Sequence, residues 1–201
     1  MATPDLSHPD YWNDLYRASD TGWDKGRPAP PLVRLLADSP VRRGAPLVVL
    51  GAGRGHDALE AARNGYVVTA VDFAEEAVKA IRAASRDQAI PLEALQQDVF
   101  LLAQSHPGAF EGALEHTSFC AIDPSRRAEY AQMVHAVLRP GGVFFGLFYA
   151  HGRPGGPPCT TDEGELRGLF APLFEIERLT TAADSFPNRA GNELEFLFRR
   201  R

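Results

Sequence analysis

The segment 46–72 limits the possible folds more than any other part of this sequence. Residues 47–50 (Leu-Val-Val-Leu) form a short apolar run that leads into a glycine-rich turn at 51–55. Such a run is typical of a strand buried on both faces of a sheet. Good helix formers follow at 58–64, and 66–71 (Tyr-Val-Val-Thr-Ala-Val) indicates a second buried strand. Together these pieces have the length of a crossover between two parallel strands.

The same alternation continues along the rest of the chain. We expect further helices at 74–86, 125–138 and 162–170, and further strands at 92–95, 111–115, 143–150, 174–181 and 193–199. The Arg-Pro-Gly-Gly sequence at 139–142 should end the helix at 125–138. Repeated alternation predicts an α/β fold with a parallel, doubly wound sheet, and the last two strands, which have no helix between them, predict a closing antiparallel hairpin.

The first 45 residues have a different character. Both tryptophans, Trp12 and Trp23, lie here with Tyr16 and a proline-rich run at 28–31, and no strand periodicity is present. The aromatic residues either staple this segment onto the core or form a lid that offers ring faces to a ligand. The 201 residues suffice for one domain. We therefore expect a single domain, 1–201, with a helical or irregular lid at 1–45 and a Rossmann-like core at 46–201.

Composition excludes several classes of function. The formal net charge of −5 and the pI near 5.7 argue against a broad electrostatic grip on nucleic acid or anionic lipid. Two cysteines, Cys120 and Cys159, are too few for a disulfide framework. The first residues lack a secretory signal pattern, and the longest apolar run, 143–150, is far shorter than a membrane span. We expect a soluble, cytoplasmic protein that acts without a membrane.

The glycine turn and two acidic residues point to a nucleotide-like ligand. The glycines alternate at Gly51, Gly53 and Gly55, whereas a dinucleotide fingerprint would place its third glycine at 56, where His56 stands. Asp72 ends the second predicted strand and is placed to accept protons from ribose hydroxyls. Asp98 follows the third strand, within reach of an adenine amino group. Ligands of open α/β sheets bind at these carboxyl ends of strands.

These features resemble class I S-adenosylmethionine-dependent methyltransferases. The resemblance rests on the glycine spacing, on Asp72 and Asp98, and on the Leu-Arg-Pro-Gly-Gly turn at 138–142. It covers most of the chain and implies a Rossmann-like sheet of seven strands, six parallel and the last antiparallel. It also implies that the 51–55 turn contacts the methionyl part of the cofactor, that Asp72 binds the ribose, and that Asp98 and Val99 bind the adenine.

Shorter motifs are similar to the thiopurine, thiol and halide methyltransferase subfamily. They are Trp-Asp-Lys-Gly-Arg at 23–27, Phe-Cys-Ala-Ile-Asp-Pro at 119–124, Arg127 with Tyr130, and Gly-Pro-Pro at 156–158. The resemblance implies cofactor contacts for Trp12, Tyr16, Trp23, Glu115 and His116. Many relatives have Asp at the position of Glu115 and an aromatic residue at that of His116. It also implies that Arg127 is the catalytic arginine of the acceptor pocket.

Methyl transfer from a sulfonium is an in-line displacement that requires alignment of the reacting atoms and exclusion of water. No metal is needed, and the six histidines show no metal-ligand spacing. Soft anions need little help from a base, so Arg127 could act by stabilising the anionic acceptor. The alternative is that Arg127 simply pairs with a carboxylate. The residues after the fourth strand, 115–119, lack the Asn/Asp-Pro-Pro-aromatic signature of nucleic-acid amine methylation.

The sequence therefore predicts transfer of a methyl group from S-adenosyl-L-methionine to a small soft nucleophile: a thiol, hydrosulfide, halide, thiocyanate or thiopurine. The acceptor is a small molecule, with no nucleic acid or membrane partner, and the chain is expected to be a monomer or weak dimer. One alternative is a binding protein that keeps the cofactor pocket without catalysis. Another is a nicotinamide-dependent reductase, disfavoured because position 56 is not glycine and no Tyr-x-x-x-Lys pair is present.

Overall fold

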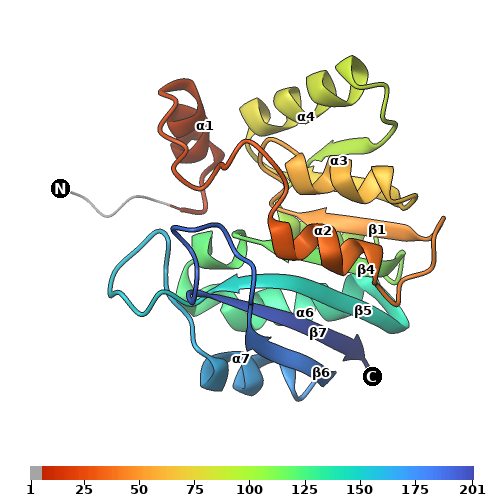
Figure 1. The fold of residues 1–201 in the computed structure, drawn as a ribbon, viewed down its shortest axis with the longest axis vertical. Coiled ribbons are helices and arrows are strands. Elements are labelled where there is room, and N and C mark those ends of the chain that lie inside the picture. The colour runs from red at the N-terminus through yellow and green to blue at the C-terminus, as the bar shows by residue number, and fades with distance from the viewer. Residues whose placement is uncertain (1–5) are drawn as a thin grey trace.

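The computed structural model describes residues 6–201 and shows one mixed sheet with helices on both faces (Figure 1). The strands are β1 (Pro46–Leu50), β2 (Val67–Asp72), β3 (Glu93–Gln96), β4 (Phe110–His116), β5 (Leu138–Tyr149), β6 (Phe174–Thr181) and β7 (Glu193–Arg200). Their order is β3-β2-β1-β4-β5-β7-β6. Only β7 runs against the others, since it is antiparallel to both of its neighbours, β5 and β6. The predicted fold class is confirmed.

The centre of the sheet explains why the first strand is apolar without interruption. β1 lies between β2 and β4 and pairs with both in parallel. Leu47 and Val49 pack into the core on one face, while Val48 and Leu50 pack into the core on the other. A strand covered on both faces has no position for a polar side chain, so the usual alternation disappears.

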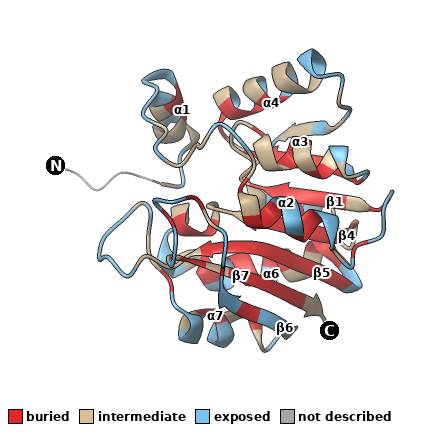
Figure 2. Cartoon of the chain, viewed as in Figure 1, coloured by how far each residue is buried: buried red, intermediate tan, exposed pale blue. Residues whose placement is uncertain are grey.

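The helices are α1 (Pro9–Arg17), α2 (Pro30–Ala37), α3 (His56–Arg63), α4 (Glu75–Asp87), α5 (Leu102–Ser105), α6 (Arg127–Val137) and α7 (Glu163–Phe170). Three short 3-10 helices, η1 (Val99–Leu101), η2 (Phe119–Ala121) and η3 (Pro124–Arg126), lie in connections. In Figure 1, α2 and α3 lie in front of the sheet and α6 lies behind it. Figure 2 shows the central strands, such as β1 and β5, and the inward sides of these helices as buried. The rear core is rich in phenylalanine, with Phe148 stacked on Phe196 at 4.1 Å between ring centroids.

The predicted boundary between lid and core at residue 45 differs from the structure. α2 contributes Leu32 and Leu36, both fully buried, to the front core. Its two prolines, Pro30 and Pro31, occupy the first turn, where a missing N–H costs nothing. They start a helix rather than interrupt the chain, so of the described part of the predicted lid only α1 and the loop that precedes α2 lie outside this core. Residues 1–5 of the predicted lid lie outside the described residues.

The Arg-Pro-Gly-Gly segment, 139–142, also differs from its prediction as a turn between helix and strand. β5 begins before it, at Leu138, which pairs with Phe110 of β4. The next pair is Gly112 with Val143, so the segment 139–142 forms an irregularity in the ladder. A Cβ atom on Gly142 would lie 2.8 Å from the carbonyl oxygen of Arg139, which makes glycine necessary there.

The carboxyl ends of β1 and β5 point toward the side of the molecule that carries α1 and the connections 150–162 and 182–192 (Figure 1). This is the edge where the sequence predicts the cofactor. In the part of the chain described here, no helix is long and apolar enough to cross a membrane.

Candidate active site

A cavity of about 530 Å³ lies at the carboxyl ends of the central strands. This volume is within the usual range for a small-molecule site, roughly 300–1,000 Å³. The predicted site residues that line it are Trp12, Tyr16, Trp23, Gly51, Gly53, Asp72, Asp98, Val99 and His116. The cavity therefore collects side chains from the lid, from the glycine turn, and from the ends of β2, β3 and β4.

The glycines of the turn have different functions. Gly53 has φ +56°, and a Cβ atom there would meet only the Tyr16 hydroxyl, at 3.4 Å, so its backbone is open to a ligand. Gly51 also lines the cavity, but a Cβ atom on it would lie 2.5 Å from Ser118 Oγ. Close packing of the turn against the loop after β4 therefore requires glycine at position 51.

Gly55 differs from its predicted place against the cofactor, since it does not line the cavity. It caps α3 with φ +84°, and a Cβ atom there would lie 2.9 Å from Ile81 Cγ1. Its conformation and its packing against α4 account for the glycine.

Asp72 is held at the end of β2 by the backbone. Its Oδ2 accepts a hydrogen bond from Gly53 N and its Oδ1 accepts one from Ala74 N, each at 2.9 Å. Burial raises the pKa of Asp72 to about 6, although these backbone donors oppose the rise. A carboxylate has about four acceptor positions, so Asp72 can still accept a hydrogen bond from a ligand hydroxyl group.

Asp98 is half-buried at the end of β3 and caps η1, where its Oδ1 accepts from Phe100 N at 3.0 Å. Among residues 6–201, its second oxygen has no such partner and is available to a ligand donor. Val99 follows directly and lines the same wall. The pair thus offers one polar and one apolar contact, as a flat heterocycle with an amino group requires.

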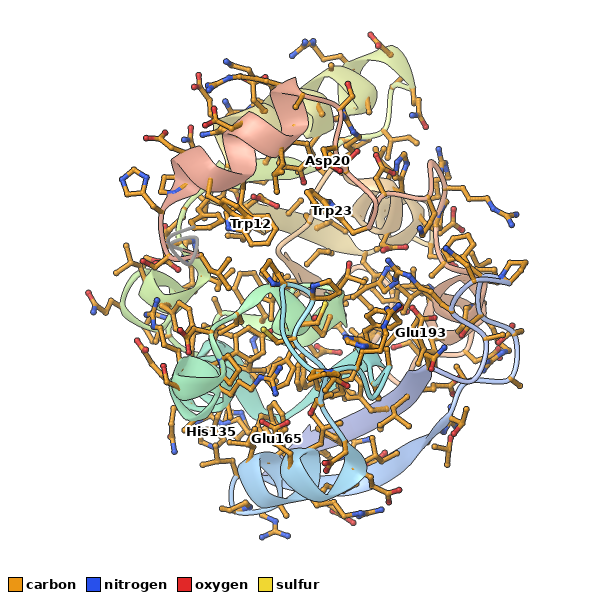
Figure 3. The ribbon with its side chains drawn as sticks, turned by 90° about the vertical axis from the view of Figure 1, so that its left-hand side faces the viewer. Trp12, Asp20, Trp23, His135, Glu165 and Glu193 are labelled. Carbon is orange, nitrogen blue, oxygen red and sulfur yellow. The ribbon has the colours of Figure 1, made fainter. Side chains whose placement is uncertain are left out.

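The aromatic residues of the lid form a cluster over the cavity. Trp23 packs edge to face against Trp12, with centroids 5.6 Å apart, and against Tyr16 at 5.7 Å. Figure 3 shows Trp12 and Trp23 close together beneath α1. Tyr16 also packs against Ala74 and Ala77, next to β2 and in α4. The cluster therefore staples α1 to the core and at the same time lines the cavity.

An ionic contact joins the lid to the glycine turn. Asp24 accepts from Arg54 Nε at 2.8 Å and lies 3.0 Å from His56 Nε2. Asp24 is part of the Trp-Asp-Lys-Gly-Arg motif, and the other two residues belong to the turn and the start of α3. This motif closes the lid onto the turn.

Glu115 does not take its predicted place against the cofactor. It is fully buried, lies outside the cavity lining, and accepts hydrogen bonds from Phe119 N at 2.7 Å and from the Tyr130 hydroxyl. Burial raises the pKa of Glu115 to about 7. Consecutive side chains of a strand point to opposite faces, so Glu115 faces α6 while His116 faces the cavity.

Arg127 is also away from its expected position at the acceptor. It is 2% exposed and does not line the cavity. Its Nη1 lies 2.7 Å from Glu165 Oε2 of α7, and its Nη2 donates to the carbonyl oxygen of Cys159. In Figure 3, Glu165 lies far from Trp12 and Trp23, at the other end of the molecule. The geometry agrees with the alternative interpretation, an arginine paired with a carboxylate.

Three residues of the cavity region were not predicted from the sequence: Asp57, Arg189 and Glu193. His116 Nδ1 lies 2.7 Å from Asp57 Oδ2, and its Nε2 lies 3.0 Å from Arg189 Nη1 and 3.5 Å from Glu193 Oε1. Arg189 donates to Glu193 Oε1 at 3.0 Å and to the carbonyl oxygen of Trp23 at 3.1 Å. The sequence gives no signal for Glu193, because its strand also contains Glu195, Arg199 and Arg200.

This cluster is polar, charged and shielded from water. Arg189 is 4% exposed and Glu193 is 1% exposed. Burial lowers the pKa of His116, but the carboxylates of Asp57 and Glu193 outweigh burial and raise the pKa to about 9. His116 in turn lowers the pKa of Glu193 below its ordinary value, against the effect of burial.

Three cationic side chains of the cavity lining have no close carboxylate partner among residues 6–201. They are Lys25, Arg27 and Arg153, and within the described chain no carboxylate lies within 4.0 Å of their charged groups. Burial and the nearby charge of Arg189 both lower the pKa of Lys25. Arg153 donates to the Tyr149 hydroxyl at 3.2 Å, and the Tyr149 ring lies beside Arg189. An anion here would relieve repulsion among these cations.

The family profile of thiopurine S-methyltransferase matches residues 7–199. The chain belongs to the thiopurine S-methyltransferase family. It is 28% identical to thiocyanate methyltransferase 1 of Arabidopsis thaliana over 186 residues, covering 90% of this chain and 81% of that protein. It is 29% identical over 167 residues to a probable thiol methyltransferase 2 of the same plant, covering 81% and 72%. A thiopurine S-methyltransferase of Pseudomonas aeruginosa (strain LESB58) is 25% identical over 185 residues, with 85% of each chain covered.

Solved structures share the fold. One, from work on the conversion of a disulfide bond into a thioacetal group during echinomycin biosynthesis, has a TM-score of 0.81 at 20% identity, covering 96% of this chain and 93% of that one. Another is 1,6-didemethyltoxoflavin-N1-methyltransferase of Burkholderia thailandensis with bound S-adenosylhomocysteine, with a TM-score of 0.71 at 22% identity, covering 99% and 93%. Family and fold together identify the chain as an S-adenosylmethionine-dependent methyltransferase.

The residues present fit S-adenosylmethionine. Gly53 leaves open space where backbone must approach the ligand, and Asp72 and Asp98 each keep an acceptor oxygen for the ribose and the adenine. The rings of Trp12 and Trp23 lie on the same cavity and are suited to a sulfonium cation.

Proposed function

We propose that this family member methylates a small, soft, anionic acceptor in the wall formed by Tyr149, Arg189 and the unpaired cations. Thiolates, hydrosulfide, thiocyanate, halides and thiopurine thiolates share this chemistry. The observation that carries the proposal is the excess positive charge of that wall: Lys25, Arg27 and Arg153 lack carboxylate partners within the described chain. A neutral amine acceptor would gain nothing from such a wall, whereas an anion would.

When bound, S-adenosylmethionine supplies an electrophilic methyl group on a positively charged sulfur. The chain has to fix the position of that group. In the proposal, Asp72 accepts from the ribose and Asp98 with Val99 holds the adenine, while the backbone of Gly51 and Gly53 lies against the methionyl part. These contacts direct the methyl group toward the acceptor wall.

Arg189 orients the acceptor. Its guanidinium is fixed on three sides, by Glu193, by His116 and by the carbonyl oxygen of Trp23. A fixed donor loses little entropy when an anion binds, and it holds the nucleophile in line with the methyl group and its leaving sulfur. Positioning of this kind can supply ~7–11 kcal/mol of the rate enhancement.

The lid excludes water. Asp24 ties it to the glycine turn, and Arg189 ties it to the acceptor wall through Trp23. All of these groups come from one chain, so the proposal requires no second subunit, and a monomer or weak dimer suffices. Cys120 and Cys159 are free thiols, which suits a cytoplasmic location.

A methyl-transfer assay tests the proposal. Purified protein is incubated with S-adenosylmethionine and a panel of thiocyanate, hydrosulfide, iodide, a thiopurine, a small thiol and a small primary amine, and products are detected by mass spectrometry. We expect methylated products from the soft acceptors and none from the amine. Calorimetric binding of S-adenosylhomocysteine without turnover of any acceptor would instead support the binding-protein alternative and overturn the proposal.

A further inference from the structure

The acceptor wall holds more positive charge than a singly charged acceptor would balance. We propose that the acceptor is a thiol that also carries a carboxylate, with its sulfur beside Arg189 and Lys25 and its carboxylate at Arg153. The inference rests on the proposed function, because it concerns the same wall. It names a class of substrate, the short mercaptocarboxylates, and a specificity-determining residue, Arg153.

The deep end of the wall is balanced in charge without an acceptor. Arg189 is 4% exposed, and its partner Glu193 is 1% exposed. Burial lowers the pKa of His116, but the carboxylates of Asp57 and Glu193 raise it to about 9, so His116 carries a positive charge at neutral pH. Two cations therefore face two carboxylates in this cluster, and none of its positive charge is left over.

Lys25 adds a positive charge beside Arg189. Its Nζ donates to the carbonyl oxygen of Gly22 at 2.6 Å, which is a neutral partner. Burial and the charge of Arg189 lower the pKa of Lys25, and the nearby carboxylates offset this effect only in part. The ammonium group therefore lies in the field of Arg189, and a thiolate bound beside both cations would relieve their repulsion.

Arg153 and Arg189 contact the same side chain, that of Tyr149. The guanidinium carbon of Arg189 is 5.1 Å from the centre of the Tyr149 ring, and Arg153 Nη2 donates to the hydroxyl of this tyrosine at 3.2 Å. Arg153 Nε donates to His151 Nδ1 at 3.3 Å, and burial lowers the pKa of His151, so this partner is neutral as well. Tyr149 thus links a deep guanidinium and an exposed one on the wall of one cavity.

The wall beside these cations is also apolar. Tyr149, Phe186 and Pro158 all line the cavity. Phe186 adjoins Arg189, because its carbonyl oxygen accepts from Arg189 N at 2.8 Å. Pro158 adjoins the other end, because its carbonyl oxygen lies 3.1 Å from His151 Nε2. A short carbon chain with an anionic group at each end matches this distribution of charge and apolar surface.

A carboxylate is the anionic group that suits Arg153. Among residues 6–201, Nη1 of Arg153 has no hydrogen-bond partner, and a planar guanidinium pairs well with carboxylate oxygens. Thiocyanate and halides have a single charged centre, which would contact Arg189 and leave Arg153 unmatched. The carboxylate takes no part in the bond changes. The thiolate sulfur forms the bond to the methyl carbon with its own electron pair, and the pair of the broken bond stays on the leaving sulfur.

Two acceptors of similar size test this role: β-mercaptopropionate and its neutral amide, β-mercaptopropionamide. With Arg153→Met, we expect kcat/KM for the acid to fall about fivefold further than that for the amide, because one charged contact is lost. Each fall is measured relative to wild type, so the different ionisation of the two thiols cancels. Thiocyanate, which has no second charged group, should follow the amide. Mass spectrometry quantifies the methylated products.

Two further variants separate a specific contact from a general attraction of anions. Arg153→Glu should widen the difference between acid and amide to about 20-fold, because attraction becomes repulsion. Arg27→Met is the matched control, since Arg27 is also an exposed cation of the cavity lining but contacts the Phe186 ring. It should leave the ratio of acid to amide within about twofold of wild type. Calorimetry with S-adenosylhomocysteine verifies that each variant is folded and binds cofactor.

The outcomes are distinguishable. Equal falls for acid and amide in the Arg153 variants would overturn the inference, and so would an equal change of their ratio in Arg27→Met. In either case, turnover of thiocyanate by the wild-type protein would leave the proposed function intact. Wild-type protein that methylates none of the three acceptors would contradict the proposed function and this inference with it.

Discussion

Two buried arginines in this molecule each bind a glutamate, yet they belong to different parts of it. Arg127 binds Glu165, two backbone carbonyl oxygens and the face of the Phe119 ring, all outside the cavity. Arg189 binds Glu193 and the titratable ring of His116, and it lines the cavity. Burial and ion pairing alone therefore do not mark a functional arginine. The distinguishing feature is a network that opens onto the ligand space.

The last two residues of β4 show the same division within one strand. Glu115 faces α6 and accepts hydrogen bonds from Phe119 N and the Tyr130 hydroxyl. His116 faces the cavity and contacts Asp57 and Arg189. Substitutions on the α6 side should change stability, and substitutions on the cavity side should change activity.

The largest expected effect is on the pH dependence of stability at Glu115. Its folded pKa, about 7, lies above its ordinary value of 4.5, so the stabilisation from the protonated form is complete below about pH 4.5 and is lost as pH rises through 7. The glutamine of Glu115→Gln cannot ionise. The free energy of unfolding of this variant, relative to that of wild type, should therefore rise by roughly 3 kcal/mol from pH 4.5 to pH 8. Urea unfolding across this range measures the difference. A constant difference would show that Glu115 does not titrate in the folded protein.

Arg189→Met should lower kcat/KM for thiocyanate about 100-fold, equivalent to about 2.7 kcal/mol, because the fixed donor to the anion is lost. The dissociation constant of S-adenosylhomocysteine should stay within about threefold of wild type. Steady-state kinetics and calorimetry provide both values. Parallel losses in acceptor turnover and cofactor affinity would assign Arg189 to the fold rather than to the acceptor.

Arg127→Met should lower the stability of the fold and leave the activity unchanged. Loss of the buried cation leaves Glu165 without its partner, and because that side chain is one-third exposed, we expect a decrease of about 2 kcal/mol in the free energy of unfolding. Activity of the folded variant should be unchanged. The double variant Arg127→Met with Glu165→Leu removes both charges and should recover much of the stability. A selective loss of turnover in Arg127→Met would restore the catalytic role that the sequence predicted.

Asp72→Asn should give the smallest of these effects, about a tenfold weaker binding of S-adenosylhomocysteine, because charged hydrogen bonds to the ribose become neutral ones. Asp87→Asn, at the end of α4, is the control of equal chemistry. Calorimetry at pH 8, where Asp72 is ionised, measures both. An unchanged dissociation constant for Asp72→Asn would remove Asp72 from the ribose site.

The fold was predictable because its signals are local. The apolar run at 47–50, the alternating glycines and the helix formers at 58–64 each identify an element within a few residues. α2 was missed because Pro30 and Pro31 were taken as interruptions, although proline in the first turn of a helix is compatible with it.

The charged cluster around His116 was not predictable for topological reasons. Asp57, His116, Arg189 and Glu193 are far apart in sequence and meet only because β4 lies next to β1 and β7 inserts beside β5. The position of the Arg127 side chain was unpredictable for a different reason. A step of one residue turns a helix by about 100°, and a motif does not give the rotation that sends Arg127 toward α7.

The most direct test of the different roles of Arg189 and Arg127 is a crystal structure of the protein with S-adenosylhomocysteine and thiocyanate. The account predicts the anion in contact with Arg189 beside Tyr149, with Arg127 still bound to Glu165. Thiocyanate bound to Arg127, with the Arg127–Glu165 pair broken, would contradict it.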